Sequence, residues 1–358
     1  MKLNHLPALL VCLFFLSCQQ KTKNNFHSDL DQLATLLINH LLASPKYMMY
    51  ETDFLNSIHY AEVCAAYGAI KYARQSENKE LIKKLMLRYE PLKKDSIAWQ
   101  NHHVDGNVYG ILPFEFFEIT GEPEYIEHGL YLADSQWDSL REDGLTNQTR
   151  FWIDDVFMVS ALQIEAYKAT EEPKYLDRAA KFTAAYINKL QQDSGLFFHG
   201  SEAPIYWGRG NGWMAVGMAI TLTELSKEHP LYDPIVSGYI KMMNSLIKYQ
   251  GPNGMWKQVI DYPEAWDETS STAMFAYAIS VGINKEIFEG KQYEQAVIDA
   301  LLALKSRINE KGEVLGICAG TGQSTDIQYY LDRPRIDGDF HGQAPVLWLI
   351  ESMYHLSY

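Results

Sequence analysis

Two adjacent carboxylates, Asp154 and Asp155, follow the triplet Phe-Trp-Ile at 151–153, where the hydrophobic pattern predicts the start of a helix. Since successive side chains on a helix diverge by about 100°, only one of the two acids can face a common site, and the alternative for each is an ordinary helix cap. A third acid, Asp105, lies in the segment HVDGN at 103–107. If Asp105 is close to one member of the pair, repulsion between the carboxylates raises one pKa and keeps a proton available for general acid catalysis.

A second candidate segment, WGRGNGW at 207–213, places three glycines between two tryptophans. The glycines predict a stretch too flexible for helix. The segment lacks the Lys and Ser/Thr of a phosphate-binding loop and does not follow a strand, so nucleotide binding is not expected. Aromatic faces can cover the apolar side of a pyranose while Arg209 binds a carboxylate through both nitrogens. The segment therefore predicts a sugar platform with an anion-binding arginine.

Histidines and two later clusters of aromatic and cationic residues also favour a sugar-binding site. His199 can hydrogen-bond a hydroxyl or a uronate, although a lone histidine is more often structural, and the neighbours His102 and His103 lack a metal-binding spacing. We expect no metal and no cofactor. Clusters at 256–271 and 329–341 again combine aromatic and cationic residues, which favours a carbohydrate groove over ordinary rim loops. The side chains predicted at this groove are Trp152, His199, Trp207, Arg209, Asn211, Trp213 and His341, with the acids Asp105 and Asp154.

The clusters recur because the chain repeats one unit about every fifty to sixty residues. In each unit a helix opens near a tyrosine and a glycine turn follows it. The tyrosines are Tyr125, Tyr175, Tyr232 and Tyr293, and the glycines are Gly144, Gly195, Gly254 and Gly312. A repeat of this size indicates stacked supersecondary units, so the polar clusters are expected at one end of the molecule.

Helical spacing of apolar residues runs through almost the whole chain, and alternating strand-like runs are scarce. The predicted helices cover residues 28–44, 54–74, 79–93, 105–119, 123–138, 153–169, 173–190, 210–227, 231–249, 269–282, 291–308 and 341–356. Two joints, Gly-Glu-Pro at 121–123 and Glu-Glu-Pro at 171–173, end one helix and open the next.

Six helical hairpins that close on themselves make an all-α protein, an (α/α)6 barrel, and an open superhelical repeat is the alternative. In the barrel, the inner helices begin at the polar clusters, so their N-termini face one funnel. Unpaired N–H groups and helix dipoles at those N-termini favour a bound carboxylate. Pro113 is expected to kink the helix that follows Asp105.

Residues 1–18 are a predicted signal peptide, because Lys2 precedes an apolar run that is too short for a stable membrane anchor. Cys18 ends the run as in acylated bacterial lipoproteins, and plain cleavage is the alternative. Residues 19–27 are a predicted polar tether, and 28–358 are predicted to form a single catalytic domain. We expect an exported bacterial protein, periplasmic or lipid-anchored, with no other membrane contact.

The charge and composition of the chain exclude some classes of function. A formal net charge of -14 argues against nucleic acid, while leaving room for an anionic small ligand in a local cationic pocket. Outside the leader only Cys64 and Cys318 remain, too few for a disulfide framework. With 47% hydrophobic and 13% aromatic residues, packing supplies the stability and aromatic residues can line a cleft.

Five motifs together resemble those of the unsaturated glycuronyl hydrolases of glycoside hydrolase family 105, over essentially the whole mature chain. They are WIDD at 152–155, GLFFHG at 195–200, WGRGNGW at 207–213, ETSSTAMF at 268–275 and DFHG at 339–342. The resemblance implies an (α/α)6 barrel that removes a terminal 4,5-unsaturated uronic acid from polysaccharide-lyase products. It also implies that Asp154 is the acid and then the base, with Asp105 as its partner and Asp155 as a structural cap.

By the same resemblance, His199, Arg209 and Trp213 hold the uronate of an anionic unsaturated oligosaccharide. The residues after Arg209 differ from the Ala-Met-Gly of rhamnogalacturonan-type members, which leaves both rhamnogalacturonan-type and sulfated ulvan fragments as substrates. A sugar epimerase on the same barrel is an alternative, but it would use histidines for proton transfer. A non-catalytic oligosaccharide-binding lipoprotein is another, and it would not need Asp154.

Overall fold

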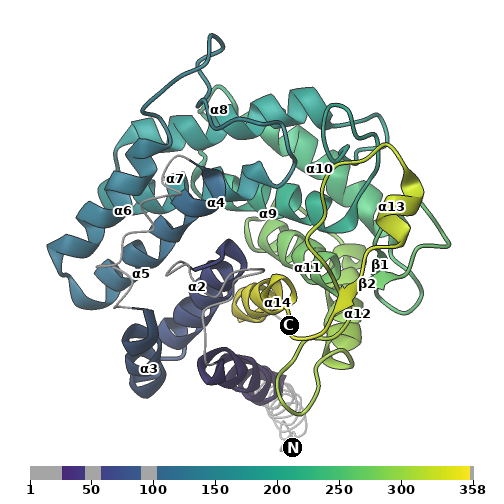
Figure 1. Cartoon of the computed structure of the whole chain (residues 1–358), viewed down its shortest axis with the longest axis horizontal. Helices are drawn as coiled ribbons and strands as arrows, with labels where there is room; N and C mark the ends of the chain where they lie inside the picture. Colours follow the sequence, from purple (N-terminus) through teal and green to yellow (C-terminus); the bar gives the residue numbers. More distant parts are fainter. Residues whose placement is uncertain (1–25, 45–57, 90–102, 355–358) are drawn as a thin grey trace, which may run out of the picture.

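The computed structural model describes residues 26–44, 58–89 and 103–354, which form a ring of paired helices (Figure 1). The predicted signal peptide with Cys18 lies outside the described residues, as does the predicted tether up to residue 25. Residues 26 and 27, assigned to the tether, instead begin the first helix at 26–43. None of the described helices is long and apolar enough to cross a membrane.

The inner helices lie side by side in a closed ring, because each contacts the next in chain order and the last contacts the first. They are α2 (Tyr60–Gln75), α5 (Ile111–Thr120), α7 (Asp155–Thr170), α9 (Gly208–Glu224), α11 (Thr269–Asn284) and α14 (Phe340–Met353). The contact between α14 and α2 closes the ring, so the (α/α)6 prediction is confirmed and the open superhelix is wrong.

The outer helices pack against the inner ring through one face. They are the helix at 26–43, α3 (Lys79–Tyr89), α6 (Pro123–Ser135), α8 (Pro173–Leu190), α10 (Tyr232–Tyr249) and α12 (Lys291–Lys305). The difference in burial explains the sequence pattern: α8 buries only the stripe that includes Tyr175, Phe182 and Tyr186, whereas α11 is buried on all sides from Thr269 to Gly282.

The repeated glycine turns fasten each outer helix to the next. Gly195 and Gly312 adopt φ values of 91° and 79°, which favour glycine. A Cβ on Gly195 would lie 2.5 Å from the backbone oxygen of Lys241 on α10, and one on Gly312 would lie 2.5 Å from that of Leu36 on the first helix. The last turn therefore docks on the first outer helix, which closes the outer layer as α14 closes the inner one.

The two predicted proline joints have the same geometry. Gly121 and Glu171 are left-handed, with φ of 70° and 58°, and they end α5 and α7. Pro123 and Pro173 then occupy the first turns of α6 and α8, where a missing N–H costs nothing. These joints confirm the predicted hairpins.

The helix predicted at 105–119 is broken into three pieces. A short α4 (Val104–Asn107) leads through the 3-10 turn η2 (Val108–Gly110) into α5. Pro113 lies just after the break, and since proline has no N–H to donate, the preceding turn is not held in α geometry. Asp105 nevertheless keeps its predicted place at the start of the inner segment.

The prediction that segment 207–213 is too flexible for helix is wrong, because α9 begins at Gly208. The glycines are required by close neighbours. A Cβ on Gly210 would lie 2.6 Å from Ile153, and one on Gly208 would lie 2.9 Å from the backbone oxygen of Lys257. Tight packing against α7 and the following loop thus overrides low helix propensity.

Two short hairpins and one short helix lie on the side of the ring formed by α10, α11 and α12 in Figure 1. They are β1 (Trp256–Lys257) with β2 (Asp267–Glu268), β3 (Ile317–Cys318) with β4 (Arg335–Ile336), and α13 (Ile327–Leu331). Trp207, Cys318 and Tyr330 share a small apolar cluster that ties these pieces to the start of α9. We call residues 317–336 the strap.

At the opposite ends of the inner helices, an ionic network fills the centre of the ring. Glu165 on α7 accepts from Tyr67 on α2 at 2.6 Å and from Lys168 at 3.0 Å. Arg74 on α2 pairs with Glu115 on α5 at 2.5 Å. These bonded polar groups belong to three different inner helices, so they join the ring rather than form an open site.

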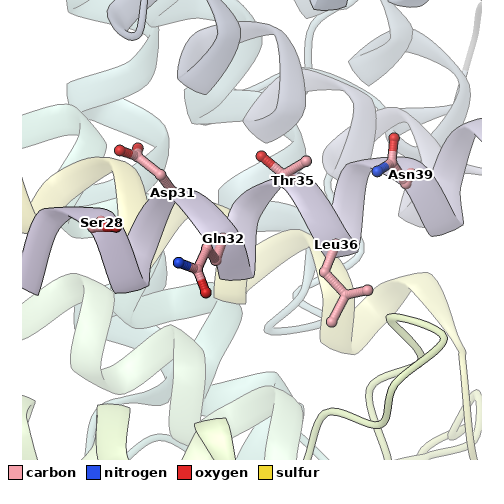
Figure 2. Close-up of a pocket in the computed structure, with 6 residues that line it drawn as sticks. All are labelled: Ser28, Asp31, Gln32, Thr35, Leu36 and Asn39. Atoms are coloured by element: carbon pink, nitrogen blue, oxygen red, sulfur yellow. The ribbon is translucent and has the colours of Figure 1, made fainter.

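A hollow of about 400 Å³ lies on the first outer helix. Its lining residues, drawn in Figure 2, are Ser28, Asp31, Gln32, Thr35, Leu36 and Asn39. Its one carboxylate, Asp31, already accepts hydrogen bonds from Tyr72 and Tyr354. None of these residues belongs to an inner-helix start, so the hollow is not the candidate active site.

Candidate active site

Asp154 and His199 face each other at the start of α7. The Oδ2 atom of Asp154 lies 3.7 Å from Nε2 of His199, and both atoms are buried without a hydrogen-bond partner among the described residues. The backbone fixes this pairing, because the N–H of Ile153 donates to the carbonyl of His199 at 3.1 Å. Since buried polar atoms are nearly always satisfied, the gap between these two side chains is suited to a polar ligand atom.

Tyr330 holds the ring of His199 in place. The Tyr330 hydroxyl lies 2.7 Å from Nδ1 of His199 and accepts from the N–H of Ser324 at 3.1 Å. Burial raises the pKa of Tyr330 to about 12, so the phenol keeps its proton, which can go to Nδ1 of His199 or to the carbonyl of Ser324 at 3.3 Å. The buried Nε2 of His199 lies on the other side of the ring and faces Asp154. Sequence reasoning noted Tyr330 only as part of a rim cluster.

Asp105 lies close enough to both acids of the pair to interact with their charges. Burial, opposed by Arg150 and helped by Asp155 and Asp154, raises its pKa from the ordinary 3.8 to about 7. About a third of the side chain, 32%, is still exposed. At neutral pH Asp105 therefore retains its proton for part of the time.

Arg150 is a site residue that the sequence analysis missed. Its Nε donates to Oδ1 of Asp155 at 3.1 Å, its Nη2 lies 3.9 Å from Oδ1 of Asp105, and its guanidinium covers the ring of Trp152 at 5.2 Å. Phe151, with φ of 52°, reverses the chain between Arg150 and the helix start. No motif marks Arg150, so only the three-dimensional turn reveals its role.

Arg209 is buried beneath the strap. It donates through Nη1 to the carbonyl of Cys318 and through Nη2 to that of Ala319 at 2.8 Å, and its guanidinium lies 4.7 Å from the ring centre of Trp207. Both terminal nitrogens thus hold the strap over α9. The structure gives Arg209 a positioning contact that the sequence prediction of a uronate clamp did not include.

Asn211 is also fully buried below the site. Its Oδ1 accepts from the N–H of Phe197 at 2.9 Å, and its Nδ2 donates to the carbonyls of Phe197 and Trp207 at 2.9 and 3.0 Å. These bonds align the His199 loop with α9. The amide that was expected to bind sugar is committed to the backbone.

His341 and Trp213 form the floor on the α14 side. His341 places Nδ1 2.6 Å from Oδ1 of Asp339 and Nε2 2.8 Å from the hydroxyl of Tyr60. Trp213 packs edge-on to Tyr60, with ring centres 6.2 Å apart. Burial, His341 and Arg209 lower the pKa of His59, which lies beside this group, to about 3, although Asp339 opposes them.

Two further observations bound the chemistry. Trp152 is half-buried and edge-on to His199, at 5.9 Å between ring centres, so it lines the mouth. Over residues 26–44, 58–89 and 103–354, no group of three or more His, Cys, Asp or Glu is arranged to hold a metal ion. The arrangement offers acid–base groups, a histidine donor and aromatic faces, which suit acid-catalysed chemistry on a sugar.

Comparison with known proteins decides the family. The profile described as Glycosyl Hydrolase Family 88 matches residues 38–357. The chain belongs to this family. The glycosidase resembles the unsaturated rhamnogalacturonyl hydrolase YesR of Bacillus subtilis, with 23% identity over 88% of this chain and 93% of the relative. It is also 28% identical to an unsaturated 3S-rhamnoglycuronyl hydrolase of an Alteromonas species, over 56% of this chain and 51% of the relative.

The fold agrees with that assignment. A solved structure described as a possible member of the GH105 family, from Salmonella enterica serovar Paratyphi A, superposes with a TM-score of 0.80. It is 20% identical and covers 91% of this chain and 94% of the other. The family resemblance that the motifs indicated is therefore confirmed for this glycoside hydrolase.

Proposed function

We propose that this glycosidase removes a terminal 4,5-unsaturated uronic acid from oligosaccharides released by polysaccharide lyases. The observation that carries the proposal is the gap between Asp154 and His199, where two buried polar atoms lack partners among the described residues beside an Asp105 whose pKa is about 7. A proton donor, a water-activating base and an open ligand position then occur together at the mouth of the barrel.

The chemistry follows from the vinyl ether of an unsaturated uronate. Protonation at C4 leaves an oxocarbenium ion at C5, water adds at C5, and the resulting hemiketal opens its ring and expels the aglycone. Asp154 gives the proton to C4 and then accepts one from the attacking water. Asp105 keeps the pair supplied with a proton below its pKa of about 7. This differs from the usual scheme of two carboxylates flanking a glycosidic bond.

Binding of the uronate uses the donors that the fold leaves at the mouth. His199 donates from Nε2, and Trp152 covers a sugar face. The indole N–H groups of Trp207 and Trp213 are buried without a partner among the described residues, so they supply further donors. Arg209 contributes its positive charge from beneath the strap, and His341 supports the α14 side through Tyr60.

The aglycone that we propose is rhamnose, in rhamnogalacturonan-type or ulvan-type fragments. The names of the two curated relatives above share the rhamnosyl unit and differ in the uronate and in a 3S substituent. The exposed rim of the strap, with Arg335 stacked 4.6 Å from the ring centre of Trp266, offers a cation for a sulfated fragment.

The test is the ultraviolet absorbance of lyase-generated oligosaccharides, because only hydration of the double bond removes that chromophore. We expect purified protein to abolish the absorbance of rhamnogalacturonan-lyase or ulvan-lyase digests and to release free rhamnosyl ends. Unchanged absorbance in both digests, with binding retained, would indicate a binding protein instead. A changed sugar configuration with the absorbance intact would indicate an epimerase.

A further inference from the structure

The second acid of the pair does not cap its own helix. Asp155 is fully buried in the first turn of α7, and its carboxylate accepts from the backbone N–H of Arg150 at 3.2 Å and from the hydroxyl of Tyr186 on α8 at 2.7 Å. The side chain of Arg150 also donates to it, from Nε at 3.1 Å and from Nη2. These partners precede α7 or lie on α8, so Asp155 holds an arginine instead of the N–H groups that a helix cap would satisfy.

The hydrogen bonds to Asp155 leave the rest of the Arg150 guanidinium at the mouth of the barrel. Asp155 takes the edge formed by Nε and Nη2, and the arginine side chain stays 32% exposed. Nη2 also lies 3.9 Å from Oδ1 of Asp105. A flexible arginine would sample many rotamers, but this one is fixed from behind by a buried carboxylate and covers the ring of Trp152.

His103 completes the contact between Arg150 and Asp105. Nη1 of Arg150 lies 3.0 Å from Nε2 of His103. On the other side of the ring, Nδ1 accepts from the backbone N–H of Asp105 at 3.2 Å and lies 3.6 Å from Oδ2 of the same residue. Burial and the charge of Arg150 lower the pKa of His103, which keeps this imidazole neutral at neutral pH.

We propose that Asp155 is a positioning residue that aligns Arg150 against Asp105, so that the chain Tyr186–Asp155–Arg150 governs the charge of the candidate catalytic carboxylate. This chain of residues is a set of direct contacts between α8, the turn before α7 and α4. The expected change in the pH dependence of kcat/KM rests on the proposed function. The expected change in the titration of Asp105 does not.

The signs of the interactions make the proposal testable. The groups that act on Asp105 are the cation Arg150, the neutral His103, and the carboxylates Asp154 and Asp155, with the buried thiol of Cys64 facing it from α2. Arg150 favours the ionised form of Asp105 and Asp155 disfavours it. Removing each charge should therefore move the titration of Asp105 in opposite directions.

The experiment measures the Asp105 carboxyl in the free protein by carbon-13 NMR, with aspartate labelled at Cγ and the signal assigned from Asp105→Asn. We expect Arg150→Gln to raise the pKa of Asp105 by about one unit or more, since an opposite charge within about 4–6 Å typically lowers a carboxyl pKa by about 1 to 3 units. Asp155→Asn should lower it, because the negative charge disappears while the amide oxygen of the asparagine can still accept from Arg150 and hold it beside Asp105. Arg150→Lys should stay closer to the wild type than Arg150→Gln.

The matched control is Arg178→Gln, which breaks a 2.7 Å ion pair with Asp134 between the outer helices α8 and α6. It should leave the Asp105 signal unchanged. If Arg150→Gln and Asp155→Asn move that signal in the same direction, or by no more than the control does, the proposal is wrong. Should Asp155→Asn fail to fold, Arg150→Gln alone decides by its sign.

Kinetics give the second readout. If the protein hydrolyses unsaturated oligosaccharides, the alkaline fall of kcat/KM should move up in pH in Arg150→Gln and down in Asp155→Asn, by the same amounts as the NMR titration. Inactivity of the wild type on every lyase digest would refute the proposed function while leaving the NMR result as a decisive test of this inference.

Discussion

Replacing Asp105 by Asn should make the protein more stable at alkaline pH while it removes activity. The structure raises the pKa of this carboxyl from 3.8 to about 7, with burial as the largest cause. A group with a raised acid pKa binds its proton more tightly when folded, so the folded state loses stability as the pH rises from about 4 to about 7. Above about pH 7 the wild type carries the whole penalty, and the amide carries none.

The size of the effect can be bounded. A rise from 3.8 to about 7 sets a ceiling of about 4 kcal/mol, at about 1.4 kcal/mol for each pKa unit. Because 32% of the side chain is exposed, solvent screening reduces this figure, and we expect about 1–2 kcal/mol. For a chain of this size that corresponds to an increase in Tm of about 2 °C or slightly more.

The assay compares the unfolding of wild type and Asp105→Asn by urea and by heat at pH 4, 6 and 8. The variant should match the wild type at pH 4 and exceed it at pH 8, with the difference growing between them. A constant difference at all three values would mean that packing, not ionisation, separates the two proteins. A variant less stable at pH 8 would refute the argument, since it would mean that the ionised Asp105 contributes favourable interactions.

Other perturbations test the remaining parts of the site. Asp154→Asn should lower kcat by about 10²–10⁴-fold with unchanged urea unfolding, as expected for loss of a general acid; full activity would exclude it as the acid. In the wild type, kcat/KM should fall as the pH rises through about 7, where Asp105 loses its proton, and a profile flat from pH 6 to 8 would contradict this. Arg209→Gln should chiefly raise KM, because it frees the strap carbonyls that it now binds, and an unchanged KM would argue against that role. Glu165→Gln should cost about 1 kcal/mol in urea unfolding, because the buried Tyr67 and the exposed Lys168 keep only a weaker partner, and no measurable loss would show that the network is dispensable.

Local chemistry made the ring predictable. Pro123 and Pro173 start outer helices because proline lacks an N–H, which the first turn of a helix does not need. Gly195 and Gly312 lie in turns that need a positive φ. Because these signals recur at one spacing, the sequence also predicted that the polar clusters gather at one end. Asp105, Asp154 and His199 do gather there, through three separate hairpins.

Contacts between residues far apart in the chain could not be predicted from the sequence. Tyr60 meets His341 across 281 residues, and Tyr330 meets His199 across 131. Nothing in the local pattern of either tyrosine distinguishes it from a core residue. The prediction that residues 207–213 are not helical is wrong for the same reason. Position 210 needs a glycine because Ile153 packs against it, and that contact is known only once α7 and α9 are packed.

The electrostatics at the mouth show which physical effect dominates. The N-terminal ends of inner helices favour ionised carboxylates by about 0.3–1 kcal/mol each, which would lower the pKa of Asp105. The pKa instead rises to about 7, because burial and the neighbouring acids disfavour the ionised form and Arg150 only partly opposes them. The three acids and Arg150 together carry a formal charge of −2 when all are ionised, and one retained proton reduces it to −1. An anionic uronate can approach that cluster more easily, so the raised pKa serves binding as well as proton transfer.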